Sequence, residues 1–235
     1  MRSVVVPLIL LLVSASPAIA ETVEAAPGVQ VTKKTYPVPI NERPFFGFAT
    51  KTSAEIAADK TFVAQIVQLA GSPRRALDET LKRGWRAFLA GDAAGASRRF
   101  NQAYLIAPEQ SAIYHAFAVV VQTRFNDMEF ADELFRIALK QPNRSETLRA
   151  DYGRFLLIAK RPADARPVLE QAVVDVPRFA DAWSNLAFAR LQTGDRPGAC
   201  VAAAKAEKFA NSGNVKSDIA LLKRQAECSL RLFRQ

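Results

Sequence analysis

Small and apolar side chains recur along this chain with a period of about 34 residues. In the clearest unit, from Ala180 to Ala206, apolar residues follow a helical spacing on both sides of a turn at Gly194 and Asp195. The pattern predicts two short helices whose small residues let them pack closely against each other. One small position recurs in every unit, as Gly84, Ala118, Gly153 and Ala187.

Two further small positions repeat with the same period, and a bulky position lies between them in most units. The first small position is Ala96, Ala131, Ala165 and Ala199. The second small position is Ala103, Ala138, Ala172 and Ala206. The position between them is Phe100, Phe135, Leu169 and, in the last unit, Ala203. The first three units are followed by Pro108, Pro142 and Pro177, each of which is expected to stop a helix.

In this period and in its small-large-small code, the chain resembles the tetratricopeptide-repeat (TPR) family over roughly Leu77 to Asn211. The resemblance implies an all-α, right-handed solenoid of about four helix-turn-helix repeats. The repeats are expected at residues 77–110, 111–144, 146–179 and 180–213. Only the last has the family's Trp-x-x-Leu opening, at Trp183 and Leu186. The second holds an extra residue before Asn126, which is expected to tilt its second helix.

Residues 1–20 have the pattern of a secretory signal peptide. Arg2 gives a positive start, an apolar run follows from Val4 to Val13, and Ala18-Ile19-Ala20 is a small-x-small cleavage motif. We expect cleavage after Ala20 and a periplasmic or secreted protein. The alternative is an uncleaved N-terminal anchor, although ten apolar residues are few for a membrane span.

Residues 21–51 contain four prolines and no helical period, and we expect an extended or disordered linker there. Phe45, Phe46 and Phe48 lie close together in this segment. These aromatic residues either form a docking motif for a partner or fold back onto the nearest groove of their own domain.

A helical domain is expected from residue 52 to residue 235. Thr52 and Glu55 fit a capping box at the start of a helix that ends at Gly71 and covers the open end of the first repeat. Residues 214–235 are expected to form an amphipathic helix that covers the last repeat. Because this helix is basic, it could instead contact an anionic membrane or cell-wall polymer.

Composition and charge fit a soluble globular protein, with 49% apolar residues, 23% charged residues and a net charge of +9. Lysine and arginine are scattered, which favours solubilising charge over a dedicated anionic partner. The expected compartment holds no chromosomal DNA, so we expect no nucleic-acid partner. In an oxidising compartment, Cys200 and Cys228 form either a disulfide or two buried thiols.

The sequence offers little to a catalytic mechanism. His115 is its single histidine, and no phosphate-binding glycine loop is present. We therefore expect no enzyme activity, no metal site and no cofactor.

The resemblance implies that the first helix of each repeat lines a groove for a protein or peptide partner. The family's groove positions that we select are Trp85, Phe88, His115, Val119, Gln122, Arg154, Leu157, Ser184 and Phe188. Further groove positions are Leu81, Leu89, Thr123, Ile158 and Leu191. Because Leu81 and Trp85 replace the polar clamp that some relatives use for a carboxylate, an apolar peptide or helix is the expected ligand.

At the first repeat, this groove is either open or covered by the N-terminal helix or linker. The expected function is a non-catalytic periplasmic scaffold that recruits a protein partner into an envelope assembly. One alternative is an accessory protein that binds an anionic membrane or polymer through the basic C-terminal helix. The other is a regulatory subunit of an envelope enzyme or export machine. The sequence does not indicate an oligomeric state.

Overall fold

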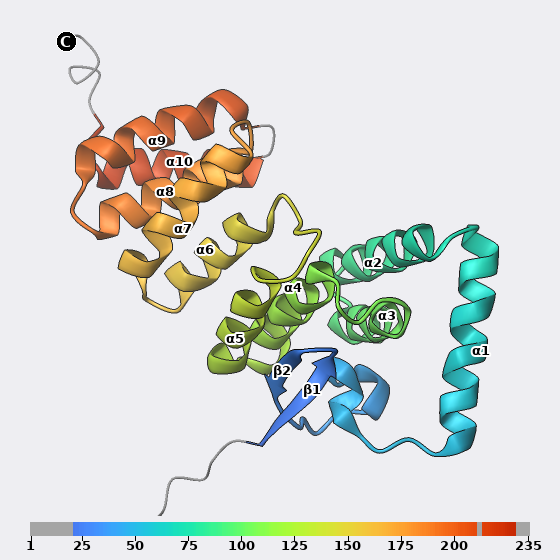
Figure 1. Ribbon diagram of the computed structural model, residues 1–235. Coiled ribbons are helices and arrows are strands. Elements are labelled where there is room, and N and C mark those ends of the chain that lie inside the picture. The colour runs from blue at the N-terminus through green and yellow to red at the C-terminus, as the bar shows by residue number, and fades with distance from the viewer. Residues whose placement is uncertain (1–20, 211–212, 229–235) are drawn as a thin grey trace, which may run out of the picture.

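The computed structural model describes residues 21–210 and 213–228 and consists mainly of paired antiparallel helices (Figure 1). Four helix pairs follow one another along the chain. They are α2 (Pro73–Leu89) with α3 (Ala93–Ile106), α4 (Ser111–Val120) with α5 (Met128–Ala138), α6 (Leu148–Ile158) with α7 (Pro162–Asp175), and α8 (Ala180–Gln192) with α9 (Arg196–Phe209). The fold is the all-α right-handed solenoid that the repeat pattern predicts.

The recurring small residues bring paired helices into close contact. A Cβ atom added to Gly84 on α2 would lie 2.3 Å from Cε1 of Phe100 on α3. A Cβ atom on Gly153 of α6 would lie 2.3 Å from Cγ of Leu169 on α7. The small position of one helix therefore receives the bulky position of its partner, as close packing requires.

Aspartate residues in three turns start the second helices. Asp92, Asp127 and Asp195 each accept a hydrogen bond from the backbone amide three residues further on, over 2.7, 3.0 and 2.8 Å. Each carboxylate satisfies an amide that the helix leaves unpaired. Each cap therefore fixes the point at which the turn ends and the second helix of the pair begins.

The extra residue of the second repeat is accommodated by a π-helical turn, η3 (Val121–Phe125). The turn continues α4 and ends at Asn126, whose φ of 52° lies in the left-handed region. A π-turn holds one more residue than an α-helical turn, so the insertion lengthens the end of α4.

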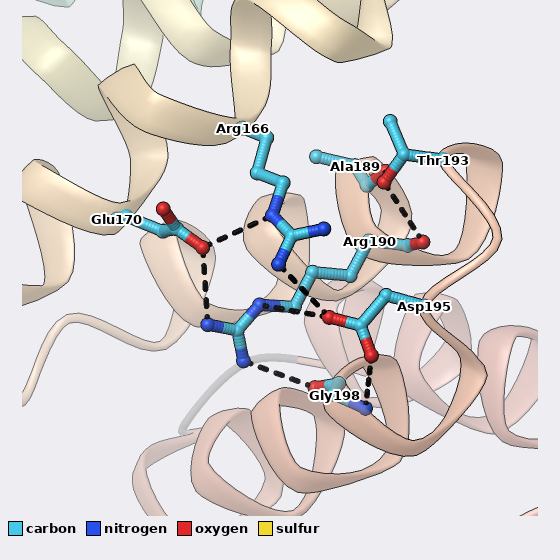
Figure 2. A network of polar contacts seen from close by, with 7 residues as sticks. All are labelled: Arg166, Glu170, Ala189, Arg190, Thr193, Asp195 and Gly198. Atoms are coloured by element: carbon cyan, nitrogen blue, oxygen red, sulfur yellow. Dashed lines mark hydrogen bonds and ion pairs between the residues drawn. The ribbon is translucent and has the colours of Figure 1, made fainter.

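A polar network joins the third and fourth repeats (Figure 2). Glu170 accepts hydrogen bonds from Arg166 over 3.1 Å and from Arg190 over 3.2 Å. Arg166 also donates to Asp195 over 3.1 Å, and Arg190 donates to the carbonyl oxygen of Gly198 over 3.3 Å. The network links α7, α8 and the turn before α9. Burial acts to raise the pKa of Glu170, but the two arginines together outweigh it and hold the pKa below its usual value.

Helix α10 (Gly213–Gln225) covers the end of the solenoid. Val215, Ile219, Leu222 and Ala226 are buried, and Lys223 forms an ion pair with Glu207 of α9 over 2.7 Å. Cys200 of α9 and Cys228 are joined in a disulfide, with their Cα atoms 5.5 Å apart. Of the two states that the sequence left open for these cysteines, the structure has the bonded one. The capping helix ends earlier than predicted, at Gln225, because the chain turns at Glu227, whose φ of 57° is left-handed. Residues 229–235 of the predicted helix lie outside the described residues.

The expectation of an extended or disordered linker at 21–51 is wrong. This segment, which we call the N-terminal arm, forms an antiparallel hairpin, β1 (Thr22–Ala26) with β2 (Val29–Thr32), and two short 3₁₀ turns, η1 (Ile40–Glu42) and η2 (Pro44–Phe48). Its order comes from burial, because Val29, Val31 and Phe45 pack into the core formed by the first two repeats. The prolines lie in turns and connections, where they do not prevent folding.

The expected cover over the first repeat is also absent. Helix α1 (Ser53–Ala70) has the predicted capping box at Thr52 and Glu55, but none of its residues is buried. In Figure 1, α1 stands apart from α2 and α3 along most of its length. The predicted helix and its cap are present, but the helical period of a segment does not determine which surface the helix packs against.

Candidate functional site

The candidate site is a groove that follows one face of α4. It has a volume of about 830 Å³ and lies between α2, α4, α6 and the residue that precedes α8. We call it the α4 groove. Its lining consists of Trp85, Phe88, Leu89, Ala112, His115, Val119, Gln122, Thr123, Phe135, Ser145, Thr147, Asp151, Arg154, Phe155, Ile158 and Phe179.

One wall of the α4 groove is aromatic. The ring of Trp85 lies 5.9 Å from that of Phe88 and 5.4 Å from that of His115, measured between centroids. Behind it, Trp85 packs edge-on against Phe100 at 5.2 Å. Since Phe100 is buried in the core, the Trp85 ring is fixed from behind and presents a firm apolar surface to the groove.

A hydrogen bond to an aspartate holds the histidine at the floor of the groove. His115 Nε2 lies 2.9 Å from Oδ2 of Asp151, which joins α4 to α6 across two repeats. His115 is only 3% exposed, and its ring also packs against that of Phe135, with the two centroids 6.0 Å apart. This pair accounts for the histidine as a structural element of the floor.

The opposite wall carries the groove's unpaired charge. Arg154 of α6 is exposed and has no hydrogen-bond or ion-pair partner among the described residues. Deeper behind this wall, the hydroxyl of Tyr152 donates to Asp132 over 2.8 Å, and burial raises the pKa of Tyr152. The surface offered to a ligand therefore combines apolar and aromatic side chains with several polar ones and with the Arg154 cation at its edge, which suits a mainly apolar peptide segment.

Six of the nine selected groove residues line this cavity: Trp85, Phe88, His115, Val119, Gln122 and Arg154. The other three lie outside it. Ser184 is buried, at 5% exposed, and Leu157 and Phe188 are partly buried against the core. Only Phe179, which precedes α8, reaches the groove, so the positions selected on α8 do not contribute to it.

The first repeat leaves the groove open. The N-terminal arm instead packs where Phe45 meets Phe117 and Tyr114 of α4, at ring distances of 4.5 and 5.7 Å. Those residues lie on a different face of α4 from His115 and Val119, and Leu89 at the groove rim is 83% exposed. The arm does fold back onto its own domain, but it does not cover the α4 groove.

Several groove residues were missed by sequence reasoning. Phe179 precedes α8, while Ser145 and Thr147 lie in the loop before α6. The family's groove positions are all helical, so loop residues were not considered. Asp151 could have been found, because it follows the helical spacing of Arg154 and Ile158 on α6.

The described residues form neither a metal site nor a membrane-spanning helix. There is no group of three or more histidine, cysteine, aspartate or glutamate side chains arranged to hold a metal ion. Among the same residues, every helix is too short or too polar to cross a membrane. Val215, Ile219 and Leu222 of α10 are buried against the last repeat, whereas Leu221 is 42% exposed.

Comparison with known proteins places this fold among tetratricopeptide-repeat proteins. No protein-family model matches the sequence, and no curated protein sequence matches it significantly. A solved structure of PilF from Pseudomonas aeruginosa is 26% identical, with a TM-score of 0.57 over 68% of this chain and 76% of that one. PilW, described as a widely conserved type IV pilus biogenesis factor, is 17% identical, with a TM-score of 0.52 over 78% and 91% of the two chains.

MamA from Desulfovibrio magneticus gives a TM-score of 0.51 at 17% identity, over 67% of this chain and 90% of that one. The paired helices and the groove thus define a protein of the helical-repeat scaffold class. More particularly, the chain is similar in fold to tetratricopeptide-repeat proteins of known structure. Proteins of this fold are generally non-catalytic and bind other proteins.

Proposed function

We propose that this protein is a non-catalytic scaffold of the periplasm, which holds an apolar segment of a protein partner in the α4 groove within an envelope assembly. The observation that carries the proposal is the open aromatic wall of Trp85 and Phe88, set in a cavity of about 830 Å³. A cavity of this size accepts several side chains of an extended or helical segment. The single unpaired cation, Arg154, would orient the polar end of that segment.

The periplasmic location rests on two independent features. The pattern of residues 1–20 is that of a cleaved signal, although this segment lies outside the described residues. The disulfide between Cys200 and Cys228 belongs to an oxidising compartment. Cell fractionation followed by mass measurement tests the location. A mature chain that begins at Glu21 in the periplasm supports it, whereas a cytoplasmic chain that retains Met1 would refute it.

A matched pair of substitutions tests the groove. Leu89→Asp places a carboxylate on the groove rim, and Val174→Asp makes the same kind of change on α7, outside the groove. Both side chains are largely exposed, at 83% and 69%, so neither substitution should disturb the fold. The immobilised protein is exposed to periplasmic extract and then to the isolated partner. We expect Leu89→Asp to weaken partner binding at least tenfold, since it sets a charge against an apolar segment.

Val174→Asp should bind as the wild type does. A second variant, Gln122→Trp, fills the groove without removing a core contact and should also block the partner. Partner binding that is unchanged by both Leu89→Asp and Gln122→Trp would show that the partner uses another surface.

A further inference from the structure

A second hollow lies at the start of the solenoid, away from the α4 groove, and arginine dominates its lining. It has a volume of about 560 Å³ and lies between the end of α2 and the start of α3. We call it the arginine hollow. Its charged lining residues are Arg83, Arg86, Asp92, Arg98 and Arg99.

The positive charge of this hollow is only partly balanced. Arg98 forms an ion pair with Glu42 of the N-terminal arm over 2.6 Å. Arg99 donates to the neutral side chain of Gln102 over 2.9 Å. Arg83 and Arg86 are exposed and have no ion-pair or hydrogen-bond partner within residues 21–210 and 213–228. Together with Arg99, they leave three uncompensated guanidinium groups around one concavity.

The one carboxylate of the lining does not neutralise this cluster. Asp92 Oδ1 accepts the amide hydrogen of Gly95 over 2.7 Å and caps α3. Four arginines against one carboxylate leave the hollow with an excess of positive charge, and a concave surface with such an excess concentrates the field on a counter-ion. The planar fork of arginine matches the oxygen atoms of a phosphate group in two-point contacts. The hollow therefore has the chemistry of a phosphate site.

An apolar surface adjoins the arginine hollow along α3. Gln102 lines the arginine hollow, and Leu105, one turn further on the same helix, lines the next hollow together with α1. The α1 side chains in that second hollow are Ile56, Asp59, Lys60, Val63, Ala64 and Val67. Of the two charged groups here, Asp59 is paired with Lys51. The combined surface is cationic at one end and mainly apolar at the other.

Helix α1 is less buried than a helix with so many apolar side chains normally is. Its last nine residues, 62–70, contain no charged side chain, and Leu69 is 87% exposed. A helix that is apolar around most of its circumference is normally buried against something. No described part of this chain buries it, since every one of its residues keeps contact with solvent.

We propose that the start of the solenoid docks onto the surface of a membrane rich in anionic phospholipid. The guanidinium groups of Arg83, Arg86 and Arg99 bind headgroup phosphates, and apolar side chains of α1 enter the acyl boundary. Charge complementarity selects this occupant, because an apolar protein partner would leave the arginines unpaired and a soluble phosphate would leave α1 uncovered. This surface is separate from the α4 groove, so a partner and a membrane can be held at once.

The test is co-sedimentation of the purified protein, with its processed N-terminus established by mass, with lipid vesicles. We compare vesicles of phosphatidylglycerol mixed with phosphatidylcholine against phosphatidylcholine alone. We expect binding to the anionic vesicles only, fading as salt is raised. Each basic side chain near an anionic surface contributes about a factor of five, so Arg83→Gln with Arg86→Gln should weaken binding roughly twenty-five-fold.

Matched variants test whether vesicle binding depends on this surface or only on the net charge of the protein. Arg178→Gln with Lys205→Gln removes the same charge from exposed positions elsewhere and should leave vesicle binding nearly unchanged. Ile56→Asp, at a 44% exposed position in the apolar part of this surface, should weaken binding to anionic vesicles through α1. Circular dichroism establishes that each variant is folded.

Three results would overturn the proposal. The first is wild-type protein that does not bind anionic vesicles. The second is an equal loss of vesicle binding in the Arg83→Gln/Arg86→Gln variant and in the Arg178→Gln/Lys205→Gln variant. The third is full competition by millimolar inorganic phosphate or pyrophosphate together with no effect of Ile56→Asp, which would identify a site for a free phosphate compound. None of these outcomes depends on the partner of the α4 groove.

Discussion

Asn101 Nδ2 donates a hydrogen bond of 2.7 Å to the carbonyl oxygen of Arg43, from a side chain with no exposed surface. The same nitrogen donates to the carbonyl oxygen of Asn41 over 2.9 Å, and Asn101 Oδ1 accepts from the amide of Phe46 over 3.1 Å. One side chain of α3 thus satisfies three backbone groups of the N-terminal arm. It also fixes the turn in which Phe45 and Phe46 adopt positive φ angles, a costly conformation for such residues.

Replacing this side chain should release the arm. We expect Asn101→Ala to lower the free energy of unfolding by about 2–4 kcal/mol, because buried backbone groups lose their partners. Urea unfolding measures the loss, and limited trypsin digestion at Lys33 and Lys34 detects the freed arm. The control is Gln171→Ala, which removes one exposed hydrogen bond on α7 and should change stability by less than about 0.5 kcal/mol. An arm that stays protected in Asn101→Ala would show that Phe45 alone anchors it.

The arm should also detach in acid. Arg124 and Arg98 donate to Glu42 over 2.5 and 2.6 Å, and these hydrogen bonds hold the pKa of Glu42 below its usual value. Because the unfolded chain has the higher pKa, it binds the proton first as pH falls. The stabilisation is therefore complete above the ordinary carboxyl pKa and is lost as pH falls through the lowered value.

The measurement is the urea midpoint as a function of pH, between about pH 6 and 3. Glu42→Gln should flatten this dependence, whereas Glu79→Gln, on the exposed face of α2, should leave it as in the wild type. Identical pH profiles for wild type and Glu42→Gln would contradict the assignment.

The repeats could be predicted because their code is local. Gly84 and Phe100, or Gly153 and Leu169, face each other across one turn, so their spacing along the chain determines the contact. The order of the arm could not be predicted in the same way. It depends on contacts such as that between Thr32 and Glu133, which lie 101 residues apart and leave no periodic signal.

The α4 groove, too, could be predicted from the sequence only in part. Trp85, His115 and Arg154 were found because they follow the repeat, but Phe179 was missed because it lies just before a helix. Where the groove ends depends on how successive repeats are stacked, and this is set by many contacts at once. For α1, periodicity predicted the helix and its cap but carried no information about its packing partner.

The small positions of the repeat should not tolerate even one methyl group. In Gly153→Ala, the new Cβ would lie 2.3 Å from Cγ and 2.4 Å from Cδ2 of Leu169. We expect a loss of about 1–3 kcal/mol in the free energy of unfolding, although alanine favours a helix by about 1 kcal/mol over glycine. Gly213→Ala, with nothing within 4 Å of the new atom, is the control and should not destabilise the protein. Equal stability of the two variants in urea would show that the helices move apart at little cost.

The disulfide should stabilise one end of the solenoid rather than the whole. Cys200 and Cys228 are separated by 28 residues, and closing a loop of this length contributes about 3–4 kcal/mol by constraining the unfolded chain. Since each repeat contacts mainly its neighbours, this contribution should be felt by α9 and α10 and little by α4. We expect Cys200→Ala with Cys228→Ala to speed hydrogen exchange in residues 213–225 and to leave exchange in 111–120 close to that of the wild type. Reduction of the wild type should reproduce the effect, and reduction of the double variant, as control, should change nothing. Faster exchange that spreads evenly through all helix pairs would mean that the solenoid unfolds as a single cooperative unit, and that the bond between α9 and its capping helix stabilises every repeat.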